Sequence, residues 1–286
     1  MRSTSFPSAK GLIGGALVLA LGASMAFAAG ETVHIDRQSW SFAGIRGQFE
    51  EAQLQRGFQV YKEVCATCHG LKRISFRNLA EPGGPEFPAE GVKGLAETYR
   101  IEDGPNDQGK MFQRAGRPSD AIPSPYKNEQ EARAVQNGAY PPDLSLIIKA
   151  RSAGENTSVL ATIGSMLRDI PSGYQEGGAD YLYALLTGYS NPPADMTLAR
   201  GMTYNRAFPG HQIAMVPPLQ PGQVKYEDGT QATVEQYARD VTAFLAWAGD
   251  PKLEERKRMG ILVLLYLLVT AGLVYAAKRR LWAKVH

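Results

Sequence analysis

The chain has 286 residues, 44% of them hydrophobic, and a formal net charge of +3. This length suffices for one sizeable globular domain with appendages, and the composition excludes a disordered or collagen-like protein. Residues 29–251 hold 26 acidic against 21 basic residues, a net charge of −5, which leaves a nucleic-acid role without electrostatic support and favours a basic protein partner.

Residues 1–28 have the pattern of a secretory signal peptide. Arg2 and Lys10 precede an apolar run over residues 11–21, which is too short to span a bilayer, and an Ala-Phe-Ala sequence ends at Ala28. We expect cleavage after Ala28 and export of the chain that follows.

Residues 29–251 are expected to form one exported domain of helices joined by long, proline-rich loops. Leu54, Phe58 and Tyr61 recur at i, i+4 and i+7 and predict a helix that runs directly into Cys65. Loops of such length inside a compact domain need a body to pack against, and a haem would supply a large, flat, apolar one.

A second helix is predicted near the end of this domain. Thr233 and Gln236 have capping-box spacing, and Gly249 with Pro251 ends the helical pattern. The two apolar stripes are expected to pack on each other. The apolar positions of the second are Val234, Tyr237, Val241, Phe244, Leu245 and Ala248.

Residues 260–277 contain no charged side chain and predict a transmembrane anchor. At about 1.5 Å per residue these 18 residues cover roughly 27 Å of hydrocarbon. Basic residues lie both in the link, residues 252–259, and in the tail, residues 278–286, so charge hardly decides the orientation. Export of the N-terminal domain decides it, and places the tail in the cytoplasm.

The sequence Cys65-Ala-Thr-Cys68-His69 is a C-x-x-C-H motif. Its two thiols can add to the vinyl groups of a haem while the histidine becomes an axial iron ligand. A thioredoxin-type thiol pair, a small structural disulfide and a zinc site completed by His211 are the alternatives. The first lacks a βαβ context, and the second would close too small a loop to stabilise much.

The sixth iron ligand is expected to be Met215, which lies in a proline-stiffened loop before the second helix. A thioether ligand raises the haem potential, which suits a carrier that accepts electrons from a quinol pool. His34 and His211 are alternatives. The other methionines of the domain, more typical of core or surface filling, are Met111, Met166, Met196 and Met202.

Beyond this motif the chain resembles the cytochrome c1 family over nearly the whole exported domain and the anchor. The resemblance is carried by CATCH at 65–69, EDGPNDQGKMFQRAG at 102–116, NGAYPPDLSLIIKAR at 137–151, YLYALLTGY at 181–189, YNRAFPGHQIAMVPPL at 204–219 and KRMG before the span. It implies a mainly α, class I c-type cytochrome-like head with long loops, plus one C-terminal transmembrane helix.

The resemblance also implies site residues. The family's axial methionine falls on Met215, Arg151 would pair with a haem propionate, and Pro142, Tyr204 and Asn205 would line the pocket. Residues 155–177 form an insertion absent from shorter members of the family. No disulfide can pin it, since Cys65 and Cys68 are the sequence's only cysteines.

By resemblance the chain is the haem c subunit of a cytochrome bc1 complex, a redox subunit and not an enzyme by itself. It would accept electrons from a Rieske iron-sulfur protein beside cytochrome b, in a dimeric complex of the bacterial inner membrane with the haem in the periplasm. A soluble basic cytochrome c would be the acceptor. The acidic residues Glu97, Glu102, Asp103 and Asp107 are candidates for its docking face, and a plain solvated face is the alternative for each of them. The alternative is a free-standing anchored cytochrome c that serves a terminal oxidase.

Overall fold

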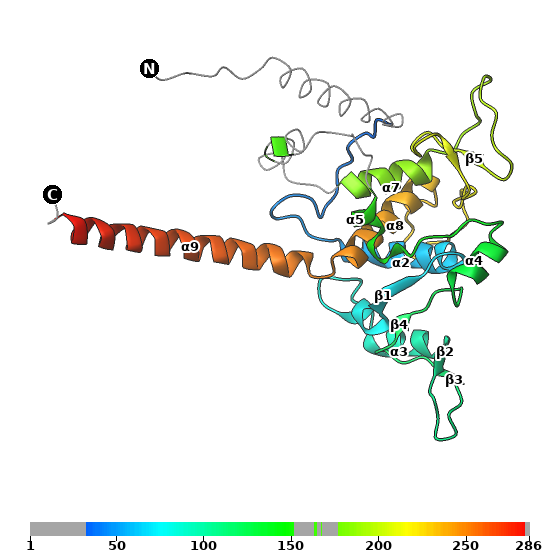
Figure 1. Cartoon of the computed structure of the whole chain (residues 1–286), viewed down its shortest axis with the longest axis horizontal. Helices are drawn as coiled ribbons and strands as arrows, with labels where there is room; N and C mark the ends of the chain where they lie inside the picture. Colours follow the sequence, from blue (N-terminus) through cyan, green and yellow to red (C-terminus); the bar gives the residue numbers. More distant parts are fainter. Residues whose placement is uncertain (1–32, 152–162, 165–166, 168–176, 284–286) are drawn as a thin grey trace, which may run out of the picture.

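The computed structural model describes residues 33–151, 163–164, 167 and 177–283, which form a mainly helical head and one long helix that leaves it (Figure 1). The predicted signal peptide and most of the insertion lie outside the described residues. The helices are α2 (Glu51–Glu63), α3 (Ala89–Glu97), α4 (Glu129–Val135), α5 (Ile147–Ala150), α7 (Gly177–Thr187), α8 (Val234–Gly249) and α9 (Leu253–Trp282), with 3-10 turns η2 (Cys65–Thr67), η3 (Phe76–Ala80) and η4 (Leu144–Leu146).

The core of the head lies where α2 crosses α8, as the two apolar stripes predict. The ring of Phe244 lies 5.5 Å from that of Phe58 and 5.9 Å from that of Tyr61. The backbones approach closely at Gly57, where an added Cβ would lie 2.1 Å from the carbonyl oxygen of Asp240. Only glycine fits at this crossing, which sets the angle at which α2 delivers the following turn.

Helix α8 begins at the predicted cap. The Thr233 hydroxyl accepts a hydrogen bond from the Gln236 N–H at 3.2 Å, which satisfies one orphan donor of the first turn. The Gln236 side chain does not complete a capping box, since it donates to the buried Asp240 carboxylate at 2.9 Å. Asp240 also pairs with Arg56 of α2 at 3.0 Å, so the same carboxylate ties the two helices together.

Three short antiparallel strand pairs were not predicted from the sequence. They are β1 (Leu71–Ser75) with β4 (Ala121–Ile122), β2 (Arg100–Asp103) with β3 (Phe112–Ala115), and β5 (Thr203–Tyr204) with β6 (Gln212–Ile213). The β2–β3 hairpin projects from the head (Figure 1). Arg114 on β3 pairs with Asp103 of β2 and with Asp120, which joins the hairpin to the segment that follows it.

Helix α9 follows α8 after three residues, 250–252. Its 30 residues correspond to about 45 Å of helix, and by length and composition it can cross a membrane. None of its residues is buried against the head. The mainly α class and the single apolar C-terminal helix of the described residues confirm the predicted architecture.

Candidate haem-binding site

The motif cysteines lie on a single helical turn at the end of α2. Residues 65–67 form the turn η2, and the N–H groups of Cys68 and His69 both donate to the Cys65 carbonyl, at 3.1 and 2.9 Å. Cys65 and Cys68 are free thiols with partly accessible surfaces. The stripe of α2 is packed on α8, so this turn has a fixed orientation relative to the core.

The His69 ring is held by a residue 73 positions away. Its Nδ1 lies 2.8 Å from the Pro142 carbonyl oxygen. A carbonyl can only accept, so Nδ1 carries the proton and Nε2 keeps its lone pair. Burial lowers the pKa of His69, although the hydrogen bond to Pro142 opposes this shift. A neutral imidazole with a free Nε2 is the form that ligates a metal.

The loop that carries Pro142 is tied to the segment after His69. The Asp143 carboxylate accepts from the Lys72 N–H at 2.9 Å and caps η4 through the Ser145 N–H at 3.0 Å. The Leu144 N–H donates to the Gly70 carbonyl at 2.9 Å. These bonds keep the Pro142 carbonyl beside the histidine ring.

Met215 follows the β5–β6 pair and packs, partly buried, against the hydrophobic core, against which Cys65 also packs. The Tyr189 hydroxyl donates to the Met215 carbonyl at 3.1 Å, which anchors the loop to the end of α7. His211, the alternative ligand, has a positive φ of 59°, and its Nδ1 lies 3.2 Å from the Asn205 carbonyl.

The expected pocket residues have different surroundings. Arg151 is exposed at the end of α5, and its charge opposes the rise in the pKa of Tyr181 that burial causes. Tyr204 lies with its ring 5.6 Å from that of His211. Asn205 is fully buried, and its side chain donates to the Leu185 carbonyl at 2.8 Å and accepts from the Ala207 N–H at 2.9 Å.

Asn205 therefore ties α7 to the loop that leads to Met215. Its described hydrogen bonds use both side-chain polar atoms, so it shapes the loop through the backbone.

The sequence profile of the Cytochrome C1 family matches residues 40–285. The chain belongs to the cytochrome c1 family. It is 52% identical to cytochrome b/c1 of Bradyrhizobium diazoefficiens over 86% of this chain, although it spans only 35% of that relative. It is 46% identical to cytochrome c1 of Blastochloris viridis (90% of this chain, 88% of the relative) and 40% identical to that of Rhodospirillum rubrum (96% and 97%).

The cytochrome c1 family carries covalent haem c, and the two cysteines have the spacing of its attachment motif. The residues present fit this group. Two thiols lie on one turn, and the adjacent histidine presents an unprotonated Nε2 because Pro142 fixes its tautomer.

Gln136 is a residue of this cytochrome c1 site that the sequence did not reveal. Its Nε2 lies 3.6 Å from the Cys68 sulfur and 2.7 Å from the Tyr126 hydroxyl. It follows α4, and no local pattern marks it, because its partner in the motif is 68 positions away.

The thiol chemistry contrasts with that of a thioredoxin-type pair. Burial raises the pKa of the Cys65 thiol to about 12, with a further contribution from Cys68. Redox-active cysteines instead have lowered pKa values, since the thiolate is the nucleophile. As a free thiol, Cys65 is therefore poorly suited to exchange at neutral pH, which argues against the thioredoxin-type alternative.

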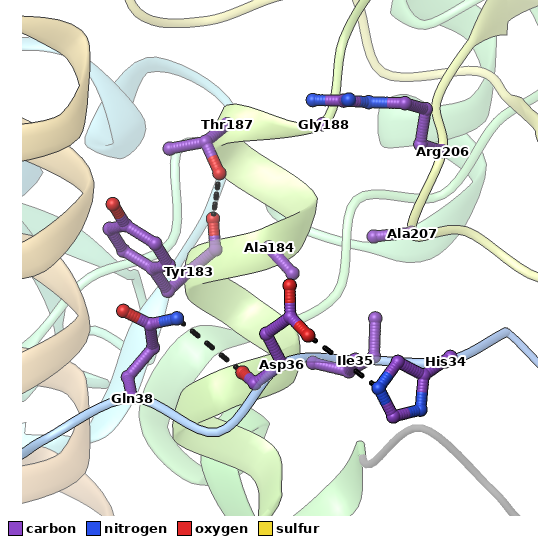
Figure 2. Close-up of a pocket in the computed structure, with 10 residues that line it drawn as sticks. All are labelled: His34, Ile35, Asp36, Gln38, Tyr183, Ala184, Thr187, Gly188, Arg206 and Ala207. Atoms are coloured by element: carbon purple, nitrogen blue, oxygen red, sulfur yellow. Dashed lines mark hydrogen bonds and ion pairs between the residues drawn. The ribbon is translucent and has the colours of Figure 1, made fainter.

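An open hollow of about 310 Å³ lies elsewhere on this cytochrome c1 head (Figure 2). It is bordered by α7 and by the segment that carries His34 and Asp36, whose side chains are paired at 3.5 Å. Its lining includes His34, the alternative sixth ligand, but none of Cys65, Cys68, His69 and Met215, so we do not assign the cofactor to it.

Proposed function

We propose that this chain is the electron-transfer subunit of a cytochrome bc1 complex, accepting an electron from a Rieske iron-sulfur protein and reducing a soluble cytochrome c. The main support for this proposal is the family match over residues 40–285, together with the helical turn that holds the motif at 65–69. The name of the Bradyrhizobium relative, cytochrome b/c1, joins this family to cytochrome b, and our chain matches only part of that protein.

Two thioether bonds, from Cys65 and Cys68 to the haem vinyl groups, are proposed to hold the cofactor. The iron would take His69 Nε2 on one side and the Met215 thioether on the other. The His69 assignment is supported by its hydrogen bond to the Pro142 carbonyl. The Met215 assignment is supported by a loop anchored through Tyr189 and packed on the same core as the motif turn.

Arg151, Pro142, Tyr204 and Asn205 are proposed to complete the pocket. Arg151 would pair with a propionate through an exposed guanidinium, and Tyr204 would line the wall. Pro142 would act mainly through its carbonyl, and Asn205 through the loop that it ties to α7.

Haem c supplies the one-electron chemistry of its iron. The protein contributes ligand choice, burial and position. A thioether ligand favours ferrous over ferric iron and raises the potential, which suits a carrier that receives electrons derived from a quinol pool. The hydrogen bond from His69 to Pro142 keeps the ring in one tautomer and orientation, in which Nε2 would hold the iron.

The head is proposed to lie in the periplasm of a bacterial inner membrane, with α9 as a single-pass anchor and residues 278–286 in the cytoplasm. The link between α8 and α9 is three residues long, which favours a fixed position beside cytochrome b over a mobile tethered carrier. The complex is proposed to be dimeric.

Extraction of membranes with a gentle detergent tests this function. We expect the haem c of this chain to migrate with haem b and an iron-sulfur protein in one complex whose quinol-dependent reduction of cytochrome c survives. A lone haem c band beside an intact haem b complex would contradict the proposal and favour the free-standing carrier for a terminal oxidase.

A further inference from the structure

The loop over residues 41–48 is held against the first turns of α9. Lys257 of α9 donates to two carbonyls of the loop, that of Phe42 at 2.7 Å and that of Gly47 at 3.0 Å. Glu254, one turn earlier, accepts from the Phe49 N–H at 2.8 Å. Two hydrogen bonds therefore join the loop to the helix, and a third holds Phe49, the residue that follows the loop.

The loop is compact. The Gln48 N–H donates to the Ser41 carbonyl at 3.0 Å, and an added Cβ at Gly47 would lie 1.9 Å from the Ala43 carbonyl oxygen. Gly44 has a positive φ of 72°, which side chains rarely adopt. This closure brings the Phe42 and Gly47 carbonyls to the same ammonium group.

The tip of the loop exposes an apolar and a basic side chain side by side. Ile45 is 61% exposed, and Arg46 is exposed next to it. Figure 1 shows the chain before α2 projecting on the side of the head from which α9 leaves.

The contacts with α9 set the level of the loop relative to a bilayer. Lys257 precedes the start of the apolar run at residue 260 by three residues, about 4.5 Å along the helix axis. The headgroup layer on each side of the hydrocarbon is roughly 5–7 Å thick. With α9 spanning the bilayer as proposed above, the backbone of Lys257, whose side chain holds the loop, therefore lies at the level of the lipid headgroups.

We propose that the 41–48 loop is a membrane-interface contact in which Ile45 inserts among the lipid headgroups and Arg46 binds their phosphates. An apolar side chain next to a guanidinium suits this layer. The apolar side chain can reach the boundary with the acyl chains, and the guanidinium can donate two hydrogen bonds to one phosphate. The head then meets the bilayer at the loop as well as at α9, and its tilt is fixed.

Depth measurement with a spin label tests this contact. Ile45→Cys offers the only free thiol once Cys65 and Cys68 hold the haem, and Val135→Cys is the matched control, since Val135 is 62% exposed on α4. The haem-loaded chain is labelled with a nitroxide and placed in vesicles of phosphatidylcholine and phosphatidylglycerol. We expect the ratio of collisions with oxygen to those with a water-soluble nickel chelate to be severalfold higher at position 45.

Equal ratios at the two positions would show a loop in water and overturn the proposal. The same labels in the intact complex separate lipid from protein. Low access of both reagents to position 45 would show a subunit covering the loop, which also overturns the lipid assignment.

A second pair of variants tests whether the hydrogen bonds of Lys257 to the loop set its depth. Lys257→Met in the Ile45→Cys chain is expected to lower the collision ratio toward the Val135 value. Lys252→Met is the control, because Lys252 pairs with Glu81 and not with the loop. An unchanged ratio in the Lys257 variant would show that these hydrogen bonds do not set the depth of the loop in the bilayer.

Discussion

At the proposed haem site, a single hydrogen bond decides which histidine nitrogen would face the iron. The Pro142 carbonyl holds the Nδ1 proton of His69 and leaves Nε2 as the proposed ligand atom. The Asp143 carboxylate and the Gly70 carbonyl keep that loop in place. A proline contributes here through its backbone, and a change of its side chain alone would leave the interaction intact.

Met215→Leu is expected to leave haem attached but to lower its potential, because leucine has no sulfur to favour ferrous iron. A fall of about 59 mV corresponds to a tenfold change in the equilibrium constant of this one-electron couple, and we expect at least that. Redox titration measures it, and an alkaline pyridine spectrum confirms attachment. Met111→Leu, on the exposed hairpin, is the control and should not shift the potential. An unchanged potential in Met215→Leu would assign the ligand to another residue.

Among the secondary-structure elements, helices α2 and α8 form the central packing contact of the head. Phe58, Tyr61 and Phe244 form its apolar contact, and Asp240 links both helices through Arg56. The crossing also directs the motif turn, since η2 follows α2 after one residue. Damage to the crossing should therefore affect stability and haem orientation together.

Gly57→Ala is expected to destabilise the head by about 1–3 kcal/mol, because the new methyl group would lie 2.1 Å from the Asp240 carbonyl oxygen and force the helices apart. Gly91→Ala on α3 is the matched control. Nothing lies within 4 Å of its added Cβ, so alanine should stabilise by up to about 1 kcal/mol. Unfolding of the haem-loaded chain, followed by circular dichroism, compares the two. Equal stabilities would show that the crossing can relax.

For the molecule as a whole, residues 29–251 carry a net negative charge, while the segments on both sides of the apolar run at residues 260–277 are basic. Of the four carboxylates proposed for docking, Asp103 is already paired with Arg114, which lowers its pKa. Glu97, Glu102 and Asp107 are exposed and remain the docking proposal.

The rate of reduction of a basic cytochrome c is expected to fall steeply with added salt, because screening at 0.15 M limits attraction to about 8 Å. Replacing Glu97, Glu102 and Asp107 by their amides should flatten this dependence. The matched control replaces three exposed carboxylates on other elements, those of Glu50, Glu129 and Glu235. Stopped-flow kinetics measures both, and a rate independent of salt would contradict electrostatic docking.

The sequence by itself determined the features that depend on neighbours along the chain. The motif at 65–69, the stripe ending at Tyr61 and the cap at Thr233 act within about two helical turns, and the apolar run at 260–277 is one unbroken stretch of the chain. Their spacing is set by the 3.6-residue period and by the thickness of a bilayer, so each was readable without tertiary structure.

Only the tertiary structure decided which distant groups meet. The Pro142 carbonyl at His69, the Gln136 amide at Cys68 and the carbonyls around Lys257 join residues 68 to 215 positions apart. Backbone carbonyls are present at every residue, and so they leave no mark in the sequence. Packing of the whole chain selects the few that reach a histidine ring or an ammonium group, and those contacts orient the site and the head.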